Sequence, residues 1–149
     1  MLNGTTFGFI NGIITILSLI TGLYATRVNK IGIIGAILAM IISDPLCDAY
    51  AIYIAQRENN DNIKPDIAIN AFLSQVSLQG LFLLIIMATP TIKSGLYLSY
   101  FTGFIATLGY SYYKDISMDD TIKNFIGIII LIGVTFIIDN FVYKYFKRK

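Results

Sequence analysis

The chain has 149 residues, of which 56% are hydrophobic and 13% charged, and its mean hydropathy is +0.71. Soluble domains carry about 25% charged residues, so this composition favours a membrane protein in contact with a lipid bilayer. No histidine is present, which excludes the zinc and copper sites that depend on imidazole. The only basic cluster is the short C-terminal tail, so we predict no nucleic-acid partner.

Five apolar runs follow one another, each near the roughly 20 residues needed to cross a hydrocarbon core. They cover approximately residues 6–26, 31–56, 67–90, 95–113 and 121–143. In lipid the backbone must satisfy its own hydrogen bonds, so continuous runs of this length are expected to be helices. We therefore predict an all-α fold, an integral, multi-pass membrane bundle of five transmembrane helices. It forms a single domain over residues 1–149, because no connection is long enough to separate two domains.

Glycines recur within these runs, as Gly8 and Gly12 do in the first one. Small residues let helices approach closely in lipid. We expect two copies of the chain to pack along their glycine-rich first helices, as a homodimer with a cation path near its axis.

The second run carries the clearest functional signal, because Asp44 and Asp48 lie inside it with Cys47 between them. A charge at mid-bilayer costs about 2.5 to 3.5 kcal/mol, so intramembrane acids usually have a function. Residues four apart share a helix face, so both carboxylates can meet one cation or exchange it for protons. Pro45 has no amide hydrogen and is expected to open the helix there, which frees the carbonyl oxygen of Ile41 as a further ligand.

A simpler interpretation is that these acids only hold the bundle together by hydrogen bonds. Partners are available on the other helices: Asn11, Thr15, Ser18, Ser74, Gln75, Ser77, Gln79, Asp139 and Asn140. Gln75 and Gln79 share a face and either line a path or serve as interhelical contacts. Asp139 lies near Lys144, so an interfacial ion pair and a role in a pore or proton relay both fit it.

The first two helices resemble those of the vacuolar iron transporter family, five-helix membrane proteins that move ferrous iron or manganese in exchange for protons and work as dimers. In the first helix, the family's Asp-Gly-Leu, Ala-Leu and Gly-Leu steps are matched by Asn11-Gly12-Ile13, Ser18-Leu19 and Gly22-Leu23. In the second, its Asp, Ser-Met and Tyr-Leu-Ser steps are matched by Ile42-Ser43-Asp44, Cys47-Asp48 and Tyr53-Ile54-Ala55. Asp61 stands where the family tends to place an acid. The resemblance covers residues 8–61 and is only topological beyond them.

The resemblance implies that the family's two pore acids fall on Asn11 and Asp44 and that its metal-binding methionine falls on Asp48. Two of these three positions differ from the family. Asn11 offers an oxygen without a charge, and Asp48 offers a hard carboxylate in place of a thioether. This set favours manganese, magnesium or calcium over iron, unless Cys47 supplies a soft ligand. The family's glutamate-rich segment after the second helix is absent, because the connection is only 57–66.

Two functions follow as hypotheses. The first is transport of a divalent cation, Fe²⁺ or Mn²⁺, in exchange for protons, with no permanently bound cofactor and with Asp44, Asp48, Asn11 and Cys47 as ligands. The second is a scaffold or assembly subunit without transport, whose intramembrane acids pair with basic residues of a partner helix. An enzyme is not expected, because no nucleophile with a neighbouring base and no catalytic motif is present.

The orientation in the membrane is predicted differently by two arguments. Seven basic residues fall on the side of the C-terminus and four on the other, so the positive-inside rule favours a cytoplasmic C-terminus. The family resemblance implies the reverse.

Overall fold

The structure is a computed structural model that describes residues 4–58 and 64–146, and every regular element in these ranges is an α-helix. The helices are α1 (Gly4–Ala25), α2 (Lys30–Glu58), α3 (Pro65–Ala88), α4 (Ile92–Tyr113) and α5 (Met118–Phe146). Each begins and ends within three residues of its predicted bounds. The prediction of an all-α fold is therefore confirmed.

Four of these helices, α1, α2, α3 and α5, have the length and apolar composition needed to cross a membrane. α4 is as long as α1, at 22 residues, but carries more hydroxyl side chains. Large apolar side chains are exposed along the outer faces of α2, α4 and α5, among them Ile42, Phe101 and Ile129. These are the surfaces that lipid would cover, so the described chain has the character of a multi-pass integral membrane protein.

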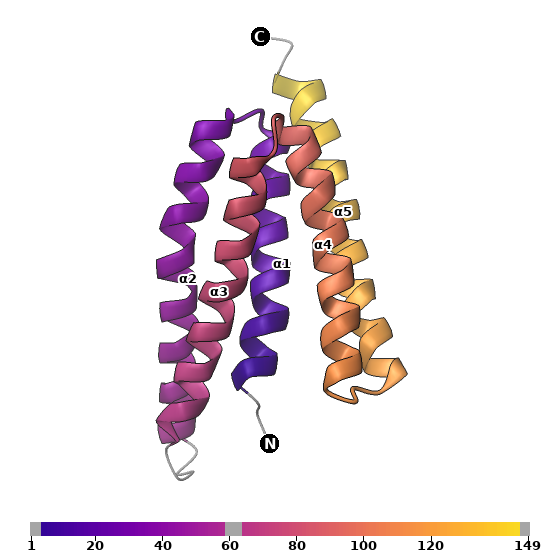
Figure 1. Ribbon diagram of the computed structural model, residues 1–149. Coiled ribbons are helices and arrows are strands. Elements are labelled where there is room, and N and C mark those ends of the chain that lie inside the picture. Colours follow the sequence, from indigo (N-terminus) through magenta and orange to yellow (C-terminus); the bar gives the residue numbers. More distant parts are fainter. Residues whose placement is uncertain (1–3, 59–63, 147–149) are drawn as a thin grey trace.

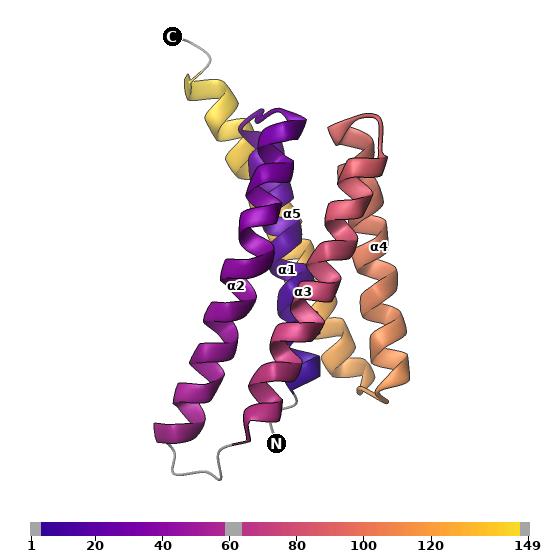
Figure 2. The ribbon, with the colours of Figure 1, turned by 60° about the vertical axis from the view of Figure 1, so that its left-hand side comes forward.

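α1 is the central helix of the bundle and packs against each of the other four. Figure 1 shows α2 and α3 on one side of it and α4 and α5 on the other. In the turned view of Figure 2, α5 passes behind α1. The hydrophobic core follows from this position. It is formed by Ile13, Ile16, Leu17 and Ile20 of α1 together with Ile33, Ile37, Leu78, Phe82, Ile86, Leu96 and Ile128 of the surrounding helices.

Two prolines differ from their predicted roles. The third helix ends at Ala88 and so excludes Pro90, which lies in the short connection to α4. α2 runs without interruption through the buried Pro45, so the expected opening of the helix is wrong. Pro45 still has no amide hydrogen for the Ile41 carbonyl. On either side of Pro45, Asp44 and Asp48 accept hydrogen bonds from α3 and α1, which are described below.

The glycines at the start of α1 are buried against α3 of the same chain. A Cβ atom on Gly4 would overlap the backbone carbonyl of Ile67, and one on Gly8 would overlap that of Ala71. A Cβ on Gly12 would lie 3.3 Å from the side chain of Gln75. These three glycines therefore bring α1 close to α3 of the same chain. The homodimer along the first helices stays a prediction.

Lys30 ties the start of α2 to the end of α3. Its Nζ donates hydrogen bonds to the carbonyl oxygens of Met87 at 3.0 Å and Thr89 at 2.6 Å. A cation is favourable at the negative end of a helix dipole, where carbonyls lack intrahelical partners.

We expect Lys30→Met to lower the free energy of unfolding by about 1 kcal/mol, because it removes this charge and both bonds. The measurement is thermal unfolding in detergent followed by circular dichroism. Lys64→Met, at an exposed lysine beside the start of α3, is the matched control and is expected to leave the midpoint unchanged. Equal midpoints for the two variants would contradict the role given to Lys30.

Candidate cation site between α1, α2 and α3

Asp44 is the middle residue of the 29-residue helix α2, about 20 Å along the axis from either end. Its Oδ2 accepts two hydrogen bonds from α3, from Nε2 of Gln75 at 2.6 Å and from Nε2 of Gln79 at 2.9 Å. Both glutamines are fully buried, and Asp44 itself is half-buried. The carboxylate therefore lies at mid-depth against two amides that have been removed from solvent.

Asp48, one turn further along α2, faces α1. Its Oδ2 accepts a hydrogen bond from Nδ2 of Asn11 at 2.5 Å. Gln79 links the two halves of this cluster, because its Nε2 also lies 3.3 Å from the Thr15 hydroxyl oxygen. The Thr15 hydroxyl in turn donates to the Asn11 backbone carbonyl at 2.9 Å. Six side chains from three helices thus form one polar cluster in the apolar bundle: Asn11, Thr15, Asp44, Asp48, Gln75 and Gln79.

The two glutamines leave their amide oxygens without partners. Oε1 of Gln75 and Oε1 of Gln79 are buried and accept no hydrogen bond within the part of the chain that the structure describes. An unsatisfied buried acceptor costs about 1 to 3 kcal/mol, so two of them beside one carboxylate need an explanation. A cation bound at this point would provide one.

Other predicted site residues lie elsewhere. Cys47 is exposed and forms none of the bonds described above. Asp139 lies on α5, and its side chain is outside the described part of the structure. Ser18, Ser74 and Ser77 donate to backbone carbonyls of their own helices.

The atoms of the cluster that could ligate a cation are amide oxygens as well as carboxylate oxygens. Among the side chains that the structure describes, which do not include Asp139, no three of histidine, cysteine, aspartate or glutamate gather as a metal-binding group. A cation at this site would therefore need the neutral oxygens of Asn11, Gln75 or Gln79 beside its two carboxylates.

A shallow groove lies on the surface between α1 and α2. It has a volume of about 490 Å³ and is lined by Thr15, Ser18, Leu19, Gly22, Leu23 and Met40. Thr15 belongs to both the groove and the cluster.

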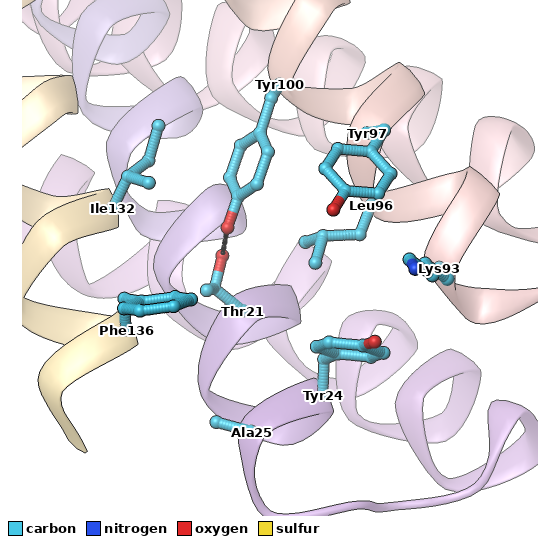
Figure 3. Close-up of a pocket in the computed structure, with 9 residues that line it drawn as sticks. All are labelled: Thr21, Tyr24, Ala25, Lys93, Leu96, Tyr97, Tyr100, Ile132 and Phe136. Carbon is cyan, nitrogen blue, oxygen red and sulfur yellow. Dashed lines mark hydrogen bonds between the residues drawn. The ribbon is translucent and has the colours of Figure 1, made fainter. Parts of the chain in front are cut away.

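A second cavity, between α1, α4 and α5, was not indicated by the sequence reasoning. Thr21 and Tyr100 are joined inside it by a hydrogen bond of 2.6 Å between their hydroxyls. Figure 3 shows these residues with Lys93 and the other side chains around them. The signal in the sequence was the spacing of Lys93, Tyr97 and Tyr100, which places all three on one side of a helix.

These features define the class of protein, a helical membrane bundle with a pair of carboxylates at mid-depth. No protein-family model, curated protein or solved structure matches the chain. The resemblance to the vacuolar iron transporters therefore stays a prediction made from residues 8–61.

Proposed function

We propose that the chain transports a divalent cation across a membrane in exchange for protons, and that Asp44 and Asp48 bind the ion. The observation that carries this proposal is the pair of buried, unpartnered amide oxygens of Gln75 and Gln79 beside the Asp44 carboxylate. A polar cluster that served only to join helices would be expected to satisfy its buried acceptors.

The charge of the cluster fits a divalent ion. Asp44 and Asp48 together supply two negative charges when ionised, and no lysine or arginine forms an ion pair with either one in the described residues. Two uncompensated charges are costly in an apolar bundle, and a divalent cation bound beside them would offset both. In the proposed exchange the ion and the protons use the same two carboxylates, which couples the two movements.

The side-chain amides of Gln75 and Gln79 can reorient when a cation binds. In the described arrangement their NH₂ groups donate to Oδ2 of Asp44. A cation at Oδ2 would repel these donors. Rotation of the amide by half a turn would bring Oε1 toward the ion, which then receives a neutral oxygen ligand. Asn11 can respond to an ion at Asp48 in the same way.

The site lies within one chain, between α1, α2 and α3. This differs from the expected path at a dimer axis, since the ligands come together without a second copy. Cys47 does not belong to the cluster, so every nearby ligand is an oxygen. Hard oxygen ligands favour Mn²⁺, Mg²⁺ or Ca²⁺, and we propose manganese ahead of ferrous iron as the transported ion.

The test is uptake by liposomes that contain the purified full chain, with Mn²⁺, Fe²⁺ and Ca²⁺ compared and a dye reporting internal pH. We expect Mn²⁺ uptake with proton movement in the opposite direction. No uptake of any ion by folded protein would contradict transport and favour the scaffold subunit, whose acids would then be required for a complex.

Cys47 gives a separate prediction for selectivity. We expect Cys47→Ser to leave both the rate of uptake and the ratio of manganese to iron unchanged, because the thiol is exposed and lies outside the cluster. The measurement is the same liposome assay with both ions present in competition. A fall in iron uptake alone would show that the thiol is a ligand.

A further inference from the structure

The cavity between α1, α4 and α5 has a volume of about 400 Å³, within the range of about 300 to 1,000 Å³ that is typical of ligand pockets. Its lining residues are Thr21, Tyr24, Ala25, Lys93, Leu96, Tyr97, Tyr100, Ile132 and Phe136. It lies near the end of α1 and the start of α4, away from the mid-depth cluster.

The two sides of this cavity differ in chemistry. Figure 3 shows Tyr24, Tyr97 and Lys93 grouped on one side and Ile132 and Phe136 on the other, with the bonded Thr21 and Tyr100 between them. Lys93 is exposed and has no acidic partner among the described residues. The cavity therefore joins a cationic, hydroxyl-bearing edge to an apolar wall, which fits an amphiphile with a negatively charged head.

A second hollow continues from the cationic edge. It has a volume of about 450 Å³ and is lined by Tyr24, Arg27, Val28, Asn29 and Ile92. Tyr24 lines both hollows, the first together with Lys93 and the second together with Arg27. This places two basic residues at a site where a headgroup would lie.

The charges at the two ends of the bundle are unequal. The end that holds the cavity carries Arg27, Lys30, Lys93 and Lys144, and no acidic side chain that the structure describes lies there. The opposite end carries the acids Glu58, Asp66, Asp115, Asp119 and Asp120 together with the basic residues Arg57, Lys64, Lys114 and Lys123. Basic pockets between membrane helices attract anionic lipid headgroups, and tyrosines favour the level of the headgroups.

We propose that this cavity binds one anionic phospholipid, with its phosphate at Lys93 and Tyr24 and an acyl chain against Ile132 and Phe136. The lipid covers a seam between α1, α4 and α5. This site is independent of the proposed transport, because no residue of it belongs to the cluster around Asp44.

The test uses the full chain in bilayers of phosphatidylcholine with a minor share of phosphatidylglycerol, released into mild detergent for native mass spectrometry. We expect one phosphatidylglycerol to be retained per chain, enriched about fivefold over its share, the factor given by about 1 kcal/mol for one basic residue. Lys93→Ala should remove this enrichment and Lys93→Arg should keep it. Lys114→Ala, at the opposite end of α4, is the matched control and should retain the lipid.

A second measurement locates the lipid. A phosphatidylglycerol with a photoreactive acyl chain is expected to label the segment of α5 around Ile132 and Phe136, and the label should survive excess soluble glycerol phosphate because the apolar wall holds the chain. Equal labelling by the phosphatidylcholine analogue, displacement by glycerol phosphate, or unchanged retention in Lys93→Ala would each overturn the proposal. Circular dichroism of each variant confirms that it is folded.

Discussion

Asp44→Asn is expected to reduce cation uptake to the level of protein-free liposomes while the chain stays folded. The substitution keeps the size of the side chain and retains an oxygen that can accept from Gln75 and Gln79, so the contacts with α3 survive. What it removes is one of the two negative charges. A divalent ion at mid-depth then faces a single carboxylate. One negative charge no longer offsets the free energy needed to remove the ion from water.

This variant separates the two interpretations of the cluster. If the acids only join helices, asparagine serves as well as aspartate, and no function of the chain should change. Uptake at the wild-type rate by Asp44→Asn would therefore rule out the proposed site. The unfolding midpoint in detergent is measured in parallel and is expected to stay close to that of the wild type.

A matched control is available at Asp115, which is exposed and follows α4. Its backbone has a φ of 50°, a conformation that asparagine adopts as readily as aspartate. Asp115→Asn removes the same charge far from the cluster and is expected to leave uptake unchanged. Loss of uptake in both variants would indicate a general effect of charge rather than a bound ion.

Gly8→Ala is expected to destabilise the bundle by about 1 to 3 kcal/mol, the usual range for overpacking. The added Cβ would overlap the Ala71 carbonyl oxygen and the Ser74 hydroxyl oxygen. The carbonyl belongs to the backbone of α3 and cannot rotate aside, so α1 and α3 must separate. The same separation would pull Asn11 and Thr15 away from the cluster.

The matched control for this effect is Gly22→Ala, in the same helix but with nothing within 4 Å of the added Cβ. Alanine is also a better helix former than glycine, so this control is expected to be neutral or slightly stabilising. Thermal unfolding in detergent by circular dichroism compares the two. A midpoint for Gly8→Ala at or above that of Gly22→Ala would show that α1 and α3 are not in the close contact described.

The hydrogen-bond partners of the cluster were only partly predictable. The sequence indicated that Asp44 and Asp48 share a face and that Asn11, Gln75 and Gln79 are candidate partners, and the structure brings these five together. The i and i+4 spacing fixes how residues on one helix are placed relative to each other. It does not fix how that helix is rotated about its axis, which is why Cys47 was expected beside the aspartates and is instead exposed.

The helical fold itself follows from the sequence, because apolar runs long enough to cross a bilayer must satisfy their backbone groups internally. The order and approximate bounds of the helices were readable in advance for the same reason, and four of those described have the length and apolar composition of membrane spans. Only the tertiary structure decided which surfaces meet. It placed Gly8 and Gly12 against α3, left two glutamine oxygens beside Asp44 without a partner among the described residues, and put Lys93 in the lining of a cavity. These outcomes depend on the fit of side chains across several helices at once, and no periodicity within a single helix contains that information.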